Sequence, residues 1–261
     1  MNIEIIHEPT ADKPFLVIYK PKGLPSAPLT EEDSQNALAQ AIEKFPEIKS
    51  VCGKKPIEYG LLHRLDTATD GLMVIAATQE CYDFLITEQA EGRFIKTYTA
   101  ECDIIKDNAE KLGGFPTEVP ELTELPEVTS YFRPYGEGRK EVRPVTENSG
   151  KAALAKLGKK KLYTTKIEIK KLSDTRAQAT CEITEGYRHQ VRCHLAWSGY
   201  PVIGDQLYNS ECKTSDLRHE LSDLRHAELV SASDLLELKF SATKIAFEYP
   251  KDKINTFTCH A

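Results

Sequence analysis

A carboxylate, a guanidinium and an imidazole lie within four consecutive residues of this chain, in the segment HRLD at 63–66. The apolar run at 72–77 follows after a turn at 67–71, and such a run predicts a strand buried on both faces. Asp66 and Arg64 are therefore expected beside the core. Charges there are costly unless they are paired with one another or used in chemistry.

Pairing and chemistry are both open for this segment on its own. Arg64 and Asp66 are two residues apart, so their side chains share one side of an extended chain and could form a structural ion pair. Such pairs occur at strand ends without any function. The choice depends on what the rest of the chain places around Asp66.

Three kinds of chemistry could use the residues of this segment. A metal site drawn from His63, Asp66, His189 and His194 is disfavoured, because an i, i+5 spacing puts the last two about 140° apart on a helix. A kinase site is excluded because HRLD has a leucine inside the HRD pattern and the chain has no Gly-rich phosphate loop. A glycosidase needs two carboxylates, and here Asp66 has only Asp70 as a second.

Several elements are expected to position these side chains. Residues 15–19 and 94–103 have strand patterns, and the second strand puts Lys96, Tyr98 and Ala100 on one face. Helices are expected over 31–45 and directly after the central strand. A further helix of about three turns from His189 would place Arg192 inward, where it would need a carboxylate partner. Asp66 is the natural candidate.

The remaining segments are read as hairpins, strands and surface chain. Residues 163–172 and 176–184 alternate as a hairpin, and 236–249 alternate in part as strands. Residues 130–145 are either an RNA-facing loop or a solvated hairpin with cations on its rim. Residues 107–129 are acidic and Pro-rich and are expected to be a surface excursion. The lysines expected to form the main basic patch are Lys156, Lys159, Lys160, Lys161, Lys166, Lys170 and Lys171.

Composition restricts the class of protein. With 40% hydrophobic and 28% charged residues, the 261-residue chain has the balance of a water-soluble globular protein. It has no apolar run long enough for a membrane span and no secretory signal pattern, so a cytoplasmic protein is expected. Its seven scattered cysteines form no CxxC pair, which argues against a zinc site and a disulfide framework. The net charge of −6 means that a nucleic-acid partner would need a local basic face.

Four motifs in order resemble those of the RluA-type RNA pseudouridine synthases. HRLDTATDG at 63–71 resembles HRLDxxTSG, and YKPKGLP at 19–25 resembles a strand followed by KPxG. KTYTA at 96–100 resembles KxYxA, and GYRHQVRCHLAWSGYPVIGDQLY at 186–208 resembles GRTHQIRxHLxxxGxPIxGDxxY. Together these motifs span most of residues 15–208.

The resemblance implies an α/β (α+β) fold with a mixed, mainly antiparallel central sheet flanked by helices. It implies isomerisation of uridine to pseudouridine in RNA, without cofactor or metal. Asp66 then matches the essential aspartate, acting as a nucleophile on the sugar or as the base that removes a sugar proton. Further matches are Tyr98 to the tyrosine against the base, Arg192 to the arginine that pairs with the aspartate, and Arg64 to the arginine used when the nucleotide flips. His63 and Lys20 are further candidates for substrate contact, Lys20 through a phosphate.

The resemblance also has departures. Asp70 stands where the family usually has Ser, and Tyr187-Arg188 replaces the usual Arg-Thr. A single catalytic domain over 1–261 is expected, without an S4-like domain and with an insertion at 210–235 that holds the near-repeat of DLRHEL as DLRHAEL.

Three hypotheses follow. The first is a monomeric synthase acting on a structured stem-loop of ribosomal or transfer RNA, with no DNA or membrane partner. The second is an RNA-binding protein of the same fold, whose biological effect survives the loss of Asp66. The third is a glycoside hydrolase that would release free base or sugar.

Overall fold

The computed structural model describes residues 1–122, 127–157, 160–212 and 237–260, and divides into two compact units. Unit 1 comprises Met1–Tyr98, Ile183–Glu185 and Ser241–Ala261, and unit 2 comprises Thr99–Glu182 and Gly186–Phe240. The described chain contains ten strands with antiparallel and parallel pairings, together with short helices. The predicted α+β class with mixed strand pairing is confirmed. No helix among the described residues has the length and apolar character needed to cross a membrane.

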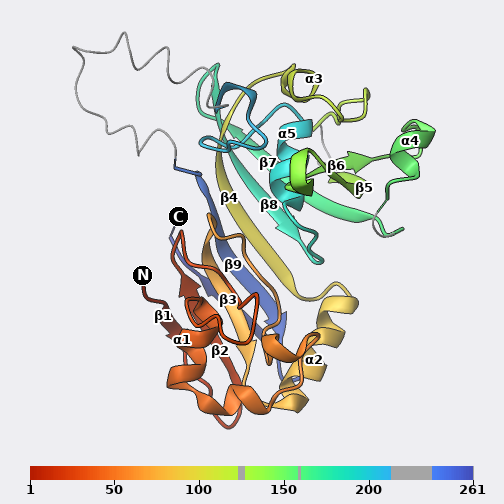
Figure 1. Ribbon diagram of the computed structural model, residues 1–261. Coiled ribbons are helices and arrows are strands. Elements are labelled where there is room, and N and C mark those ends of the chain that lie inside the picture. The colour runs from red at the N-terminus through yellow and green to blue at the C-terminus, as the bar shows by residue number, and fades with distance from the viewer. Residues whose placement is uncertain (123–126, 158–159, 213–236, 261) are drawn as a thin grey trace. The chain divides into compact units, whose positions relative to one another are not determined.

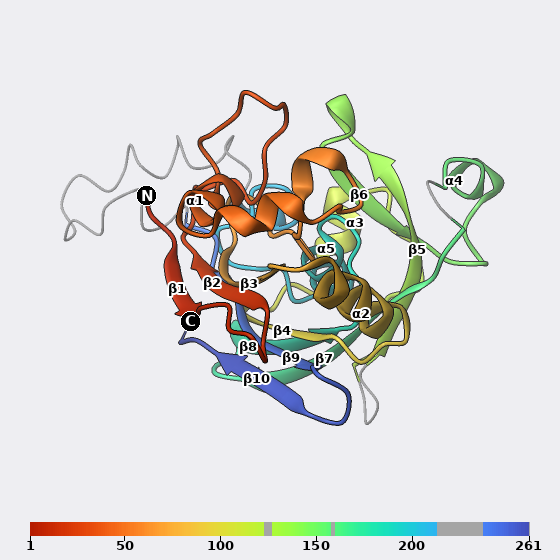
Figure 2. The same cartoon turned by 90° about the horizontal axis from the view of Figure 1, so that it is seen from below.

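Unit 1 is built on strands β1 (Glu4–His7), β2 (Phe15–Lys20), β3 (Asp70–Ala76), β9 (Phe240–Glu248) and β10 (Ile254–Thr258). Strand β2 runs antiparallel to β1 and β3, and β3 pairs in parallel with β9 (Figure 1). Strand β10 runs antiparallel beside β9 (Figure 2). All seven residues of β3 are buried, as the apolar run predicted.

The helices of unit 1 are α1 (Ala37–Lys44) and α2 (Gln79–Ala90), with 3-10 turns at Pro46–Ser50 and Pro56–Glu58. The helix expected over 31–45 is confirmed, but its predicted start is wrong by six residues. The Asp33 carboxylate accepts hydrogen bonds from the backbone N–H groups of Leu29 and Gln35 and holds this stretch as a turn. Asn36 then caps α1, because its Oδ1 accepts from the N–H of Ala39 at 2.9 Å.

One face of β2 and β3 packs with α2, β9 and the chain end in a common core. Aromatic rings dominate this core: Phe94 stacks on Phe247 with centroids 5.1 Å apart, and Phe15 contacts Phe247 edge to face. The core therefore fixes β3, which begins directly after the HRLD turn.

Unit 2 contains the second half of β4 (Ile95–Asp103), whose first half lies in unit 1, and strands β5 (Glu127–Tyr135), β6 (Glu141–Val145), β7 (Tyr163–Lys171) and β8 (Arg176–Ile183). The last four follow the order β8-β7-β5-β6 with antiparallel pairing. The hairpin predicted at 163–184 is confirmed as β7–β8. The helices are α3 (Asn108–Leu112), α4 (Lys151–Leu154) and α5 (Gln190–Trp197), with 3-10 turns at Glu137–Arg139 and Ser210–Cys212.

Two expectations about unit 2 need correction. The stretch 107–122 is not only surface chain, because Asn108 is fully buried in α3 and its amide donates to the carbonyls of Ala196 and Tyr208. Helix α5 has eight residues, shorter than three turns, and all of them are buried. Residues 123–126 of the expected excursion, and 213–235 of the expected insertion with its repeat, lie outside the described residues.

The lysines of β7 do not form a uniform basic face. Lys166 lies opposite Glu182 in the ladder, and its ammonium is 3.6 Å from the Glu127 carboxylate. Lys171 pairs with Asp174 at 2.8 Å. Positive and negative side chains therefore alternate on the exposed face of β7, and Lys159 of the expected patch lies outside the described residues.

Gly71 allows the close approach of β3 to β9. Its φ is +124°, and a Cβ at this position would lie 2.2 Å from the carbonyl oxygen of Ala242. We expect Gly71→Ala to lower the free energy of unfolding by about 2–4 kcal/mol, from backbone strain plus overpacking. Urea unfolding followed by circular dichroism measures this loss. Gly150→Ala is the matched control, since no atom lies within 4 Å of its Cβ position, and an equal loss in both variants would contradict the explanation.

Candidate active site

Asp66 lies in an irregular segment of unit 1 between Leu62 and β3, and its side chain is half-buried. Hydrogen bonds from the segment 20–26 hold the backbone on both sides of it. The Ser26 hydroxyl donates to the Leu65 carbonyl at 2.7 Å and accepts from the Leu65 N–H at 3.0 Å. The Gly23 N–H donates to the Thr67 carbonyl at 2.8 Å. The carboxylate is therefore carried on a fixed backbone.

Lys20 contributes to the same restraint. Its side chain is fully buried, and its ammonium donates to the carbonyls of Pro21 and Leu24 at 3.0 and 2.8 Å, with the Thr67 carbonyl at 3.4 Å. Burial lowers the pKa of Lys20 to about 8, against the opposing effect of the Asp70 and Asp66 carboxylates. These contacts favour a role in holding the loop; contact with an RNA phosphate stays a prediction.

Tyr98 lies on β4 in the same unit and is 7% exposed. Burial raises the pKa of its phenol, and the Asp66 carboxylate raises it further. The hydroxyl therefore stays protonated at neutral pH and lies within electrostatic range of Asp66. An aromatic face and a carboxylate in this arrangement can hold a planar ring beside a sugar.

Arg64 does not pair with Asp66. Its guanidinium is half-exposed, and Nη1 is 3.0 Å from Oε1 of Glu58, a carboxylate that also pairs with Lys55. The alternative of a simple Arg64–Asp66 ion pair at the strand end is therefore wrong. Residues two apart share a side only while the chain is extended, and this segment is irregular.

His63 points toward the start of β3. Its Nε2 lies 3.3 Å from the backbone N of Val74, which can only donate. The imidazole ring therefore accepts through Nε2 and packs edge to face against Phe94. His63 links the HRLD segment to the core of unit 1.

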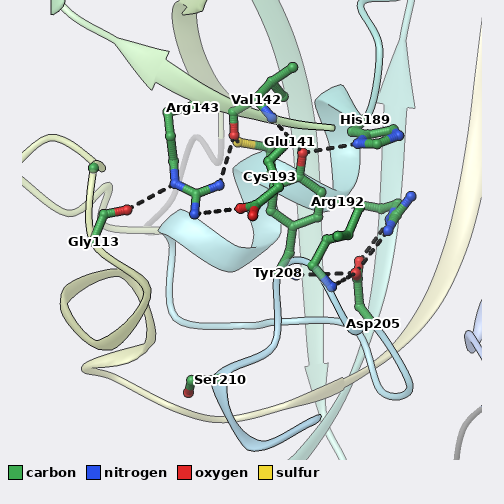
Figure 3. A network of polar contacts seen from close by, with 12 residues as sticks. Gly113, Glu141, Val142, Arg143, His189, Arg192, Cys193, Asp205, Tyr208 and Ser210 are labelled. Atoms are coloured by element: carbon green, nitrogen blue, oxygen red, sulfur yellow. Dashed lines mark hydrogen bonds and ion pairs between the residues drawn. The ribbon is translucent and has the colours of Figure 1, made fainter. Parts of the chain in front are cut away.

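Arg192 lies in unit 2 and is buried in α5, as predicted, and its carboxylate partner within this unit is Asp205. Its Nε and Nη2 donate to the two carboxylate oxygens of Asp205 at 2.7 and 2.8 Å (Figure 3). Asp205 also accepts the backbone N–H groups of Leu207 and Tyr208. The guanidinium is thus fixed in direction by a two-point contact.

Tyr208 extends this network in unit 2. Its hydroxyl accepts from the Val142 N–H at 2.9 Å and shares a hydrogen bond with Nδ1 of His189 at 3.0 Å (Figure 3). Its ring lies 5.3 Å from the guanidinium carbon of Arg192. Asp205 and Tyr208 belong to the segment GDQLY at 204–208 and were not predicted as site residues. The need of a buried arginine for an acceptor is the signal that could have pointed to Asp205.

Arg143 in the same network is buried, so it is not one of the cations on the rim of the 130–145 hairpin, where Arg139 and Lys140 are exposed. It is 1% exposed, and its guanidinium carbon lies 4.3 Å from the centroid of the Tyr135 ring and 4.5 Å from the centroid of the Phe115 ring. Its guanidinium donates to the Gly113 carbonyl and pairs with Glu141 at 2.7 Å (Figure 3). Arg143 therefore stabilises the hairpin from inside.

Five of the six predicted site residues lie in unit 1 and the sixth, Arg192, lies in unit 2, so the predicted pair of Arg192 with Asp66 stays a prediction. The unit 1 residues are Asp66, Tyr98, Arg64, His63 and Lys20. Among the described residues, no three His, Cys, Asp or Glu side chains are grouped so as to hold a metal ion. The expected independence of cofactors stays a prediction.

A family model described as RNA pseudouridylate synthase matches residues 14–197, well over half of the chain. The chain belongs to this family. Pseudouridine synthases are isomerases that act on RNA, so the enzyme class and the RNA substrate follow. The matched range includes Asp66, Tyr98 and Arg192.

Individual relatives agree with the family assignment. The dual-specificity RNA pseudouridine synthase RluA of Escherichia coli is 26% identical over 200 residues, 76% of this chain and 75% of that protein. The ribosomal large subunit pseudouridine synthase D of Buchnera aphidicola is 28% identical over 76% of this chain and 52% of that protein. The structure of human RNA pseudouridylate synthase domain containing 1 shares the fold, with a TM-score of 0.58 and 18% identity over 100% of this chain and 84% of that chain.

Asp70, the first departure of this synthase from the family motif, has its carboxylate engaged within unit 1. It accepts hydrogen bonds from the Tyr19 hydroxyl and from Ser241 Oγ, the latter at 2.7 Å. Lys22 lies 4.0 Å away. Burial and the hydrogen bond to Asp70 raise the pKa of Tyr19, so its hydroxyl remains a donor at neutral pH. The extra carboxylate is thus compensated locally.

The second departure, Tyr187-Arg188, serves packing in unit 2 of the synthase. The Tyr187 ring stacks on Phe132 with centroids 4.9 Å apart and planes 7° from parallel. Arg188 Nη2 donates to the carbonyls of Arg139 and Glu141 at 2.6 and 3.1 Å. The two residues attach the start of α5 to the β5–β6 hairpin.

The Arg192–Asp205 contact should contribute strongly to the stability of the protein. Asp205→Asn would remove the charge of the carboxylate that makes the two-point contact with the buried Arg192 guanidinium, and we expect a loss of about 3 kcal/mol in the free energy of unfolding. Thermal and urea unfolding measure it. Asp174→Asn is the control, because the Asp174 side chain is exposed in its pair with Lys171 and should be close to neutral. If Asp205→Asn and Asp174→Asn lowered the free energy of unfolding by similar amounts, the buried contact would contribute no more than the exposed pair.

Proposed function

We propose that this chain converts uridine to pseudouridine in ribosomal or transfer RNA, with Asp66 as the catalytic carboxylate. The family membership supports the reaction. The names of the E. coli and Buchnera relatives, a dual-specificity RNA enzyme and a ribosomal large subunit enzyme, support the two substrate classes. The observation that carries the proposal is the half-buried Asp66 carboxylate on a backbone held by the segment 20–26.

The reaction breaks the bond between N1 of uracil and C1′ of the sugar, turns the base and joins C5 to C1′. The proton on C5 is released and N1 ends protonated, so no atoms are gained and no redox cofactor is required. Asp66 acts on the sugar, either as a nucleophile or as the base that removes a sugar proton. Both roles need an ionised carboxylate that substrate can reach, and the partial exposure of Asp66 provides access.

The other predicted residues receive roles that agree with their surroundings. Tyr98, within electrostatic range of Asp66, packs against the target base. Arg64, half-exposed, contacts the RNA backbone once the nucleotide has left its stack. Lys20 fixes the loop next to Asp66, and His63 attaches it to β3. Arg192, oriented by Asp205, is the cation that pairs with the catalytic carboxylate.

The proposal also covers the RNA structure around the target uridine, the oligomeric state of the protein and its location in the cell. The target uridine lies in a structured stem-loop, because a base in a loop leaves its stack at low cost. The protein acts as a monomer in the cytoplasm.

Release of tritium from RNA labelled at uracil C5 tests the proposal. We expect Asp66→Asn to reduce release from unmodified ribosomal and transfer RNA transcripts by at least about 10³-fold, because the neutral amide is neither nucleophile nor base. Asp12→Asn, a change at an exposed aspartate of unit 1, is the matched control and should retain full activity.

Retained RNA binding by Asp66→Asn shows that the loss is catalytic. Equal release by Asp66→Asn and the unchanged protein would reject Asp66 as the catalytic residue. No release by the unchanged protein from any cellular RNA pool, with binding intact, would favour an RNA-binding protein of the same fold.

A further inference from the structure

Lys96 lies on β4 two residues before Tyr98, so the two side chains share a face of the strand. Their Cα atoms are separated by roughly 6.6 Å along β4. Lys96 is 5% exposed and Tyr98 is 7% exposed. A second functional group therefore stands beside the residue assigned to the target base.

The Lys96 ammonium lacks an acceptor. Within the described part of the chain it makes no hydrogen bond and no ion pair, and its only close partner is the Phe94 ring, 5.9 Å from Nζ. Lys20, buried to a similar degree, has two short contacts to carbonyl oxygens. A buried ammonium without an acceptor is costly to maintain. Nζ of Lys96 is not among the fully enclosed polar atoms without a partner, so this atom keeps some contact with solvent.

Neighbouring side chains do not supply the missing acceptor. Because Nε2 of His63 accepts from Val74, the neutral ring carries its proton on Nδ1, and this buried N–H has no acceptor either. Burial, together with the positive charge of Lys96, lowers the pKa of His63 to about 3, so the ring is neutral at physiological pH. The Glu185 carboxylate raises the pKa of Lys96, and the Lys54 ammonium lowers it. Two donors thus lie within electrostatic range of each other, and neither has a hydrogen-bond acceptor among the described residues.

We propose that Lys96 is a substrate-binding cation of this active site that takes an anionic oxygen of the RNA. The inference rests on the proposed function. Two groups of the substrate carry such an oxygen: the backbone phosphate next to the target nucleotide, and the uracil anion. The uracil becomes an anion when the C1′–N1 bond breaks and its electron pair stays on the base, with charge on N1 and O2, until C5 bonds to C1′ and releases its proton. A lysine ammonium serves either as a point charge.

The charge of Lys96 depends on pH in an accessible range. Burial lowers the pKa of Lys96 to about 8, with Glu185 opposing and Lys54 adding to the effect, and with the neutral His63 as neighbour. Lys96 is therefore charged at pH 7 and loses its charge as the pH rises through about 8. An arginine at this position would stay charged throughout.

The test compares Lys96→Met with Lys49→Met, which removes an exposed lysine of the same unit. Unmodified ribosomal and transfer RNA transcripts are the probes, and Kd, its salt dependence and the single-turnover rate of tritium release at saturating protein are measured. A phosphate contact predicts a Kd about 10-fold higher, a salt slope lower by about 1 and an unchanged rate for Lys96→Met. Contact with the uracil anion predicts an unchanged Kd and a rate about 100-fold lower.

Lys96→Arg provides the second arm and applies even where Lys96→Met does not fold. As the pH rises through 8, the Kd of the unchanged protein should rise if Lys96 contacts phosphate, and its rate should fall if Lys96 contacts the uracil anion. The Lys96→Arg variant should show neither change. The proposal would be overturned if Lys96→Met and Lys49→Met had the same Kd, salt slope and rate. It would also be overturned if the unchanged protein and Lys96→Arg had identical pH profiles. Binding is measured without turnover, so an absence of tritium release by every variant would overturn the proposed function and leave the phosphate contact readable from Kd.

Discussion

The backbone around Asp66 is held by hydrogen bonds from a segment that lies 39 to 47 residues earlier in the chain. Ser26 binds both polar groups of the Leu65 backbone, and Gly23 and Lys20 reach the Thr67 carbonyl. A carboxylate on a free loop would sample many directions, and each would have to be restricted at the moment of reaction. Here the folding of unit 1 restricts them in advance, which is the condition for efficient positioning. Strand β2 leads into the segment and β3 follows Asp66, and the pairing of these two strands brings the segment and the carboxylate together.

The cost of burying cations is handled in a consistent way, with one exception. The buried lysines and arginines among the described residues are Lys20, Lys96, Arg143 and Arg192. Lys20 donates to backbone carbonyls, Arg143 to Glu141 and the Gly113 carbonyl, and Arg192 to Asp205. Each therefore has acceptors that offset the loss of hydration. Lys96 has no such acceptor in the described part of the chain, and local rules of this kind are broken mainly at functional sites.

Local sequence predicted the regular elements where the pattern was strong. The apolar run of β3, the β7–β8 hairpin, helix α2 and the shared face of Lys96, Tyr98 and Ala100 all depend on periodicity within a few residues, and all are present. The start of α1 could not be read in this way, because Asn36 becomes the cap only after the Asp33 carboxylate has held the preceding residues as a turn. Helix α3 was missed because its burial depends on Asn108 reaching carbonyls 88 and 100 residues away. Sequence indicates that a buried arginine needs an acceptor, but in unit 2 the carboxylate that meets Arg192 is Asp205, 13 residues along the chain.

Nucleoside composition of the product RNA tests the central claim most directly. Unmodified ribosomal and transfer RNA transcripts are incubated with the purified protein, digested to nucleosides and quantified by mass spectrometry, and the low-molecular-weight fraction is assayed for uracil. Isomerisation requires that each uridine lost reappears as pseudouridine and that no free uracil is formed. Free uracil with abasic sites in the RNA would mean that the glycosidic bond is hydrolysed, and it would contradict the assignment of Asp66 to an isomerase.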